Sequence, residues 1–333
     1  MKFTEIEKQQ YQEQGYVVRK DAYSLEEVDR LGNRVRGLIR QVEESEVLNP
    51  EQKQKILMQN ELSDEEAEHY GEAARIHSIF RLHLYSQMVR EYIRDRMKLD
   101  VARDLLGEDL FCPNDLYFFK APGVGREIGW HQDSWYFRNT YESTNGESID
   151  KGTLGTWVAV DDATLENGCL WVIPGSHKRG VVEHSAVEAQ QTLQVKFNAD
   201  IAKELEKDAI PVEARRGTLI YFNNALLHSS KSNLSNLPRR AYVVHYMKAT
   251  IRHTEQGSNQ LKFALKYGLG IPEGYISGGR FDRCVQTPDD EQCLDWDSAI
   301  GRKLTREDLV LPALREFADS PTQPLDPLPK EYS

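Results

Sequence analysis

The residues with the clearest chemical potential are His131 and Asp133. They offer an imidazole and a carboxylate within residues 129–135, which read Gly-Trp-His-Gln-Asp-Ser-Trp. In an extended strand, residues i and i+2 point to the same face, so both side chains can reach one metal ion. A His-x-Asp pair alone is a weak signal, because it occurs by chance in many proteins. A second histidine would complete the two-histidine, one-carboxylate set that is typical of non-haem Fe(II) oxygenases.

A suitable second histidine is His228, which follows the strand-like run 218–222. In a jelly roll, strands this far apart in sequence can face each other across the mouth of the barrel. Ser230 adds a hydroxyl group two residues later. Arg239 lies on the next predicted strand, where its guanidinium can bind a carboxylate through two hydrogen bonds, which lysine cannot do. Arg240 competes for this role, but strand alternation points the two arginines to opposite faces, and the spacing favours Arg239.

The elements expected before this segment are mostly helices. A helix is predicted to begin after Ser24, where Glu27 three residues later completes a capping box. Residues 40–75 are rich in charged residues and glutamine and are expected to form solvent-exposed helices, with a lid or a dimer contact as the alternative. The apolar residues of 76–106 follow helical spacing, and Gly107 can end that helix.

From about residue 110 the pattern changes to short runs of β-branched and aromatic residues with turn signals between them. Including one earlier run, strands are predicted at 15–19, 116–120, 153–161, 170–173, 210–213, 218–222 and 241–247. The Asn-Gly pair at 167–168 is a strong hairpin signal, and the polar segment 137–152 is expected to be a long loop. Many short strands with turns between them favour an antiparallel barrel or a two-sheet jelly roll.

Composition limits the classes of protein and of partner. The chain has 333 residues, of which 39% are hydrophobic and 29% charged, as in a folded globular protein. Its net charge of −11 argues against nucleic acid or an anionic membrane as the main partner. No apolar run approaches the roughly 20 residues that span a bilayer, and the first residues lack the apolar core of a signal peptide. The four scattered cysteines favour reduced thiols in a cytoplasmic protein.

Four motifs, taken together, resemble the phytanoyl-CoA dioxygenase family of Fe(II)- and 2-oxoglutarate-dependent oxygenases. They are Trp-His-Gln-Asp at 130–133, Trp-Val-Ala-Val-Asp-Asp at 157–162, Glu-Asn-Gly-Cys-Leu-Trp-Val-Ile-Pro-Gly-Ser-His at 166–177, and His-x-Ser at 228–230 with Arg239. Their common order and spacing are far more specific than any one motif. The resemblance covers about residues 10–35 and 105–250.

The resemblance implies a mainly β fold with helical flanks, built on a double-stranded β-helix core of the jelly-roll or cupin type. We expect a single catalytic domain over 1–333, with a mostly helical part at 1–110, the jelly-roll core at 111–250 and a C-terminal extension at 251–333. The resemblance also implies an iron site, with the ligands His131, Asp133 and His228. Because halogenating members carry Gly or Ala at the carboxylate position, Asp133 favours hydroxylation, with release of succinate and CO2, and desaturation or ring formation are the alternatives.

For the cosubstrates 2-oxoglutarate and O2, the resemblance implies further residues. Arg239 binds the distal carboxylate of 2-oxoglutarate with help from Ser230, Trp157 lines the pocket, and Lys120 is a weaker candidate for a contact. Candidate substrate residues are Trp135, Tyr136 and His177; packing alone also explains the first two, and a structural role in a turn is favoured for His177. The remaining histidines are expected to be surface residues or hydrogen-bonded core residues, namely His69, His77, His83, His184, His245 and His253.

The sequence therefore predicts a dioxygenase that hydroxylates a small molecule, for instance a specialised metabolite such as an alkaloid or a toxin. Two alternatives stay open. One is a metal-binding jelly-roll protein without oxygenase activity, and the other is a cupin-type metalloenzyme that does not use 2-oxoglutarate. A cosubstrate clamp at Ser230 and Arg239 argues against the first alternative, because a binding module does not need one. Whether the protein is a monomer or a homo-oligomer is undecided from the sequence.

Overall fold

The computed structural model of the chain describes residues 1–44, 57–59, 65, 68–69, 76–80, 82, 87–107, 110–143, 145–182, 184–186, 195–197, 204–248 and 250–253. Its largest element is a seven-stranded antiparallel sheet. In order across this sheet, the strands are β1 (Tyr16–Arg19), β12 (Leu219–Phe222), β7 (Thr153–Ala159), β14 (Arg239–Lys248), β4 (Leu110–Lys120), β3 (Ile76–Phe80) and β2 (Leu57–Gln59).

A second, four-stranded antiparallel sheet packs on one face of the large one. In order across it, the strands are β11 (Ile210–Val212), β8 (Leu170–Val172), β13 (His228–Ser230) and β5 (Ile128–His131). Two smaller ribbons pair β9 (His184–Ala186) with β10 (Val195–Phe197), and β6 (Tyr141–Ser143) with β15 (Ile251–His253). The two main sheets form the predicted double-stranded β-helix.

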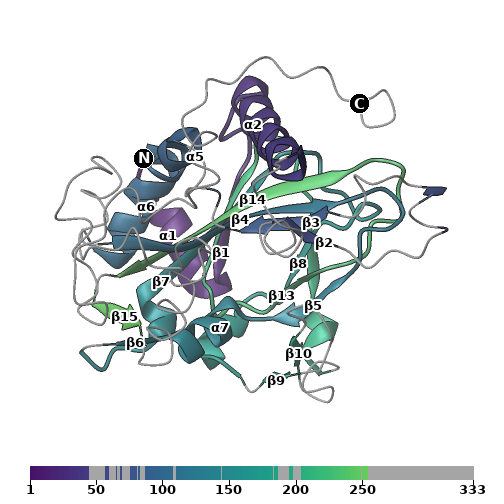
Figure 1. The fold of residues 1–333 in the computed structure, drawn as a ribbon. Helices are drawn as coiled ribbons and strands as arrows, with labels where there is room; N and C mark the ends of the chain where they lie inside the picture. Colours follow the sequence, from purple (N-terminus) through teal and green to yellow (C-terminus); the bar gives the residue numbers. More distant parts are fainter. Residues whose placement is uncertain are drawn as a thin grey trace.

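Strand alternation divides the core between the two faces of the large sheet. In β14, Ala241 and Val243 pack with Val172 and other apolar residues of the small sheet. Tyr242 and Val244 point the other way and join a cluster that includes apolar residues of the helices. Figure 1 shows this arrangement, with α2 above the large sheet and β8, β13 and β5 below it.

The helices in the described residues are only partly delimited by capping signals in the sequence. They are α1 (Glu5–Gln14), α2 (Leu25–Glu44), α5 (Gln87–Ile93), α6 (Arg96–Leu106) and α7 (Asp133–Thr140), with 3₁₀ turns at Ile149–Gly152, Ser176–Arg179 and Glu206–Asp208. The predicted capping box is confirmed, because Ser24 Oγ accepts from Glu27 N–H (3.2 Å) and the Glu27 carboxylate accepts from Ser24 N–H (2.7 Å). Gly107 ends α6 as predicted. Among the described helices, none has the length and apolar character needed to cross a membrane.

The predicted helix over 76–106 is wrong in its first part. Residues 76–80 form strand β3, in which Ser78 pairs with Phe118 of β4. A short apolar run fits a strand as well as a buried helical turn, and pairing with a neighbour decides between them. The predicted exposed helices at 40–75 are wrong at residues 57–59, which form strand β2 paired with β3, with Leu57 buried. Most of the rest of 40–75 and all residues after 253 lie outside the described residues.

The predicted hairpin at residues 167–168 is also wrong. Gly168 has φ +86°, and the Asn167 side-chain oxygen accepts from Thr164 N–H (2.7 Å), so the chain does turn here. The strand that follows, β8, nevertheless pairs with β11 and β13 of the small sheet rather than with β7. The turn therefore carries the chain from one sheet to the other. The segment between His228 and Arg239 likewise carries the chain from β13 of the small sheet to β14 of the large one.

The polar segment 137–152 is more ordered than the expected loop. It contains the end of α7, strand β6 and the 3₁₀ turn at Ile149–Gly152. β6 pairs with β15, so part of this segment is fixed by residues more than a hundred positions later. Polar composition did not reveal these short elements, because their partners are distant in sequence.

Candidate metal centre

The two candidate histidine ligands lie side by side in the small sheet. His131 ends β5, His228 begins β13, and the register pairs the two residues directly. Their ring centroids are 4.1 Å apart. Opposite residues of an antiparallel pair point to the same face. The expected placement across the mouth of the barrel is thus wrong, because the pairing of two neighbouring strands brings the candidate ligands together.

Asp133 reaches the same point from the first residue of α7 rather than from a strand. The chain turns at Gln132, whose side chain is fully buried and fixes the turn. Its amide nitrogen donates to the carbonyl oxygens of Gly180 and Ala225, and its oxygen accepts from Val182 N–H (2.9 Å). The strand geometry expected from the i, i+2 spacing is thus wrong, although the predicted proximity of imidazole and carboxylate is confirmed.

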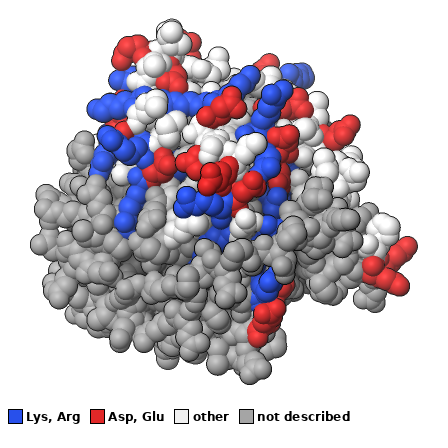
Figure 2. All heavy atoms as spheres, turned by 90° about the horizontal axis from the view of Figure 1, so that it is seen from above, with Lys and Arg blue, Asp and Glu red and all other residues white. Residues whose placement is uncertain are grey.

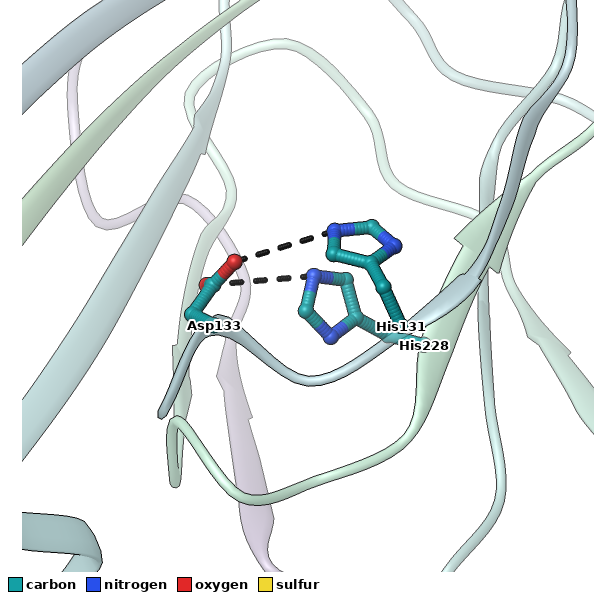
Figure 3. Close-up of side chains that lie close together, drawn as sticks. All are labelled: His131, Asp133 and His228. Atoms are coloured by element: carbon teal, nitrogen blue, oxygen red, sulfur yellow. Dashed lines mark ion pairs between the residues drawn. The ribbon is translucent and has the colours of Figure 1, made fainter. Parts of the chain in front are cut away.

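The Asp133 carboxylate faces both imidazole rings (Figure 3). His131 Nε2 lies 3.7 Å from Asp133 Oδ1, and His228 Nε2 lies 3.8 Å from Asp133 Oδ2. One ligand atom from each residue lies within 4.8 Å of the other two. In the described part of the chain, no other group of three His, Cys, Asp or Glu residues meets this spacing.

Both rings are oriented so that a metal ion can bind them. His131 Nδ1 donates to Gly129 O (2.8 Å), and His228 Nδ1 donates to Leu226 O (2.9 Å). A carbonyl oxygen only accepts, so each Nδ1 carries the proton and each Nε2 presents a lone pair. Two neutral imidazoles and one carboxylate form the donor set that suits Fe(II). The residues present therefore fit the expected metal.

Asp133 is poised to be ionised. Burial by itself would raise the pKa of its carboxyl, but the charge of the neighbouring rings of His228, His245 and His131 when they are protonated, together with the hydrogen bond from His245, outweighs burial and holds the pKa below its usual range. A carboxylate must be deprotonated to bind a metal. The surroundings of Asp133 therefore favour the form that a metal ion requires.

The structure adds His245, which the sequence analysis placed among the surface or hydrogen-bonded core histidines. Its side chain is 5% exposed, and its Nε2 lies 3.0 Å from Asp133 Oδ2. β14 runs without a register shift from Arg239 to His245, so alternation puts both on the inner face. The even spacing of Arg239 and His245 within one predicted strand indicates that both side chains face the same side. Nothing in the sequence indicates that Asp133 is the partner of His245.

The two candidate arginines face opposite sides of β14. Arg240 lies on the outer side and binds Asp161 through two hydrogen bonds, from Nε (2.7 Å) and Nη2 (2.6 Å). Arg239 lies on the inner side and is 2% exposed, and its Nε has no partner among the described residues. Burial lowers the pKa of its guanidinium to about 10. The geometry therefore leaves Arg239, and not Arg240, available to an anion.

Lys120 stands directly opposite Arg239 in the register between β4 and β14. Its ammonium group is buried and donates to the carbonyl oxygens of Arg126 (2.8 Å), Ser230 (3.1 Å) and Lys231. It thus ties the end of β4 to the segment that carries Ser230, which is itself 5% exposed. A direct contact between Lys120 and a cosubstrate stays a prediction.

The other predicted site residues are aromatic or lie in turns. Trp157 is 4% exposed and packs in the cluster between the two sheets. The Tyr136 ring lies 6.2 Å from that of His131 and 5.3 Å from that of Trp135, so both aromatic residues lie near the candidate metal ligands. His177 Nε2 instead lies 3.2 Å from Gln12 O of α1.

A family model described as phytanoyl-CoA dioxygenase (PhyH) matches residues 11–241. A phytanoyl-CoA dioxygenase of Arabidopsis thaliana is 37% identical over 134 residues, which are 40% of this chain and 43% of that protein. A phytanoyl-CoA dioxygenase domain-containing protein 1 of Mus musculus is 32% identical over 169 residues, or 50% of this chain and 55% of that protein. The chain thus matches about half the length of these relatives.

Among solved structures, EctD from S. alaskensis with bound Fe has a TM-score of 0.59 at 23% identity, covering 76% of this chain and 79% of that one. The same protein with 2-oxoglutarate and 5-hydroxyectoine has a TM-score of 0.56 at 24% identity, covering 76% and 78%. At this level of identity, the likeness supports the fold that the two sheets already display.

Proposed function

Because the chain belongs to the phytanoyl-CoA dioxygenase family, we propose that it is an Fe(II)- and 2-oxoglutarate-dependent dioxygenase that hydroxylates an unactivated C–H bond of a small molecule. The observation that carries this proposal is the trio of His131, Asp133 and His228. Both rings turn Nε2 toward the carboxylate, because both Nδ1 atoms are held by backbone carbonyl oxygens.

In this proposal the three side chains would hold the iron, and this donor set would leave the ion able to bind cosubstrate and O2. Bound Fe(II), with 2-oxoglutarate and O2, supplies the oxidant that converts C–H to C–OH while 2-oxoglutarate becomes succinate and CO2. The residues of the protein itself position the iron ligands. Gln132 fixes the turn that aims Asp133, and the pairing of β5 with β13 fixes the separation of the two rings.

The distal carboxylate of 2-oxoglutarate is assigned to Arg239. A buried guanidinium is costly unless it is paired, and the Nε of Arg239 has no partner among the described residues. An anion that enters beside β14 would pair with it through the geometry that guanidinium favours. Ser230 and Trp157 complete this part of the proposed pocket, with Lys120 holding the Ser230 segment in place.

For the substrate, we favour a polar small molecule, such as a specialised metabolite of the alkaloid or toxin type. Trp135 and Tyr136 lie next to the proposed iron ligand His131 and are candidates to contact the substrate. EctD, the similar solved structure, holds the small molecule 5-hydroxyectoine. We also propose that the protein is cytoplasmic and that nucleic acid is not one of its partners.

The test is to incubate the full-length protein with Fe(II), ascorbate and 2-oxoglutarate and to measure succinate, with and without candidate substrates. We expect succinate from the wild type and none from His131→Ala, which removes one of three protein ligands. In parallel, calorimetry should show that 2-oxoglutarate binds the metal-loaded protein. Absence of both succinate and 2-oxoglutarate binding would contradict the proposal.

These measurements, together with O2 consumption and the 2-oxoglutarate concentration, separate the two alternatives. A metal-binding protein without oxygenase activity would bind a divalent metal. It would neither bind 2-oxoglutarate nor consume O2. A cupin-type enzyme that does not use 2-oxoglutarate would consume O2 with a substrate while the 2-oxoglutarate concentration stayed constant. Either pattern would replace the proposed function.

A further inference from the structure

His245 contacts the proposed iron site from outside the set of ligands. Its Nε2 lies 3.0 Å from Asp133 Oδ2, a shorter distance than the 3.7 Å and 3.8 Å that separate Asp133 from His131 and His228. It does not join the group of three whose ligand atoms lie within 4.8 Å of one another. His245 therefore contacts the carboxylate without lying where a fourth protein ligand would.

We infer that His245 is a positioning residue, which holds the Asp133 carboxylate in the orientation that the metal ion needs. The inference rests on the proposed iron site. Oδ2 accepts a hydrogen bond from His245 Nε2, which fixes the rotation of the carboxylate about its side-chain bonds and keeps Oδ1 on the side of His131. Carboxylates that bind metals commonly accept such a bond from a residue outside the ligand set.

The hydrogen bond has a defined direction. An ionised carboxylate only accepts, so His245 Nε2 must carry a proton. The other nitrogen, Nδ1, is buried and has no partner among the described residues. A second N–H at that position would be buried without an acceptor, which is costly. The ring thus donates one hydrogen bond, from Nε2 to Asp133, and none from Nδ1.

The surroundings of His245 hold the ring still. It packs edge to face against Phe137, at 5.3 Å and 78°, and against Phe222, at 6.3 Å and 86°. Directly across the ladder, its partner in β7 is Gly155, which has no side chain to displace it. A donor on a central strand and fixed by two rings is more rigid than one on a loop.

The contact also joins the two sheets at the site. His245 belongs to the large sheet, whereas His131 and His228 belong to the small one. Asp133, at the start of α7, accepts from the large sheet while it faces the two histidines of the small sheet. The geometry of the ligand set therefore depends on how the two sheets pack, because the hydrogen bond from His245 links Asp133 to the large sheet.

The experiment measures Co²⁺ affinity of the metal-free, full-length protein by calorimetry, so that it does not depend on turnover. His245→Gln keeps an N–H donor at about the distance of His Nε2, whereas His245→Asn carries the same amide on a side chain one methylene shorter. We expect His245→Asn to bind Co²⁺ about 10- to 100-fold more weakly than the wild type, the usual effect of losing such a partner. His245→Gln should bind closer to the wild type than to His245→Asn.

Tyr246→Phe is the matched control. It removes one buried hydrogen bond, from Tyr246 to Ile93 O (2.7 Å), on the next residue of the same strand but on the helix side. We expect its Co²⁺ affinity to equal that of the wild type, even if its melting temperature falls. A general loss of packing would instead weaken Co²⁺ binding in all three variants, and that result would overturn the inference.

Two failures are distinguishable. If the wild type binds no Co²⁺, the proposed metal site is wrong, and the inference falls with it. If the wild type binds Co²⁺ and His245→Asn binds it equally well, the proposed function stands and only the positioning role is overturned. Equal weakening in His245→Asn and His245→Gln would also overturn it, because the restored donor would then have made no difference.

Discussion

Each proposed histidine ligand is oriented by the carbonyl oxygen two residues before it. His131 uses Gly129 O and His228 uses Leu226 O, at 2.8 Å and 2.9 Å. Both bonds lie within a few residues of the ligand, so each strand carries its own means of choosing the tautomer. The same local arrangement on two paired strands gives two lone pairs on one side of the small sheet.

At the residue scale, the first prediction concerns Arg239. Arg239→Lys keeps the charge but loses the two-pronged donor, and Arg239→Ala loses both. If this residue binds the distal carboxylate of 2-oxoglutarate, we expect the KM for 2-oxoglutarate to rise at least about tenfold in Arg239→Ala, or ~1.4 kcal/mol, and less in Arg239→Lys. Steady-state kinetics with varied 2-oxoglutarate and fixed Fe(II) would measure this.

Arg240 supplies the control for that experiment. Because Arg240 binds Asp161 on the outer side of β14, Arg240→Lys should lower the melting temperature while leaving the KM for 2-oxoglutarate unchanged. A rise in KM for Arg240→Lys together with an unchanged KM for Arg239→Ala would reverse the assignment of the two arginines.

At the scale of elements, the pairing of β7 with β12 and β14 leaves room for the rings that surround the site. Gly155 pairs with Phe222 on one side and with His245 on the other. A Cβ at Gly155 would lie 2.3 Å from the Phe222 ring and 2.7 Å from Asn224 Oδ1. Phe222 in turn packs against His228, with ring centroids 5.3 Å apart. The absence of a side chain at Gly155 therefore lets Phe222 reach both histidines.

Gly155→Ala is predicted to disturb the site and the core together. Phe222 and Asn224 would have to move, and overpacking of this kind typically costs about 1–3 kcal/mol. We expect a lower midpoint of urea unfolding and weaker Co²⁺ binding than in the wild type. Gly129→Ala, at a position where a Cβ meets nothing within 4 Å, is the control and should leave the midpoint unchanged. Normal Co²⁺ binding in Gly155→Ala would show that Phe222 does not support the ligands.

At the scale of the whole molecule, the helix layer buries a lysine. Lys98 of α6 is fully buried against the rings of Tyr23 and Tyr92, with Nζ 4.6 Å and 4.0 Å from their centroids, and it donates to Tyr23 Oη. Burial lowers the pKa of its ammonium to about 7, an effect that the charges of Asp95 and Glu27 offset in part. The ring contacts favour the charged form, and burial opposes it.

This lysine predicts a rise of stability with pH. Above pH 7 the folded state holds Lys98 increasingly neutral, while the unfolded chain keeps it protonated up to about pH 10.4. The unfolded state then binds more protons, so the free energy of unfolding increases with pH across that window. Relative to Lys98→Met, the wild type should gain about 2 kcal/mol between pH 7 and pH 9. Urea unfolding of both proteins at the two pH values measures the difference, and parallel pH dependence would contradict the prediction.

The surface carries charge of both signs. On the face seen in Figure 2, Lys and Arg side chains are interspersed with Asp and Glu among the described residues. No continuous field of one sign covers that described part of the face. A mixed surface of this kind, with a net charge of −11, suits the expectation of a small-molecule substrate rather than a polyanion.

The sequence by itself determined the residue types that meet in the candidate metal site, and its patterns predicted seven of the fifteen strands within the described residues. The spacing of His131, Asp133, His228 and Arg239 predicted a site of this composition, because residue chemistry and strand alternation are local properties. For the same reason Ser24 and Glu27 placed the start of α2.

Only the tertiary structure decided which elements meet. It put Asp133 on a helix, sent the chain after Asn167 into the other sheet, and brought His245 to the carboxylate. It also buried Lys98 against two tyrosine rings. Each of these depends on a partner far away in the sequence. A local pattern specifies which face a side chain occupies, but only sheet pairing and packing specify what lies opposite it.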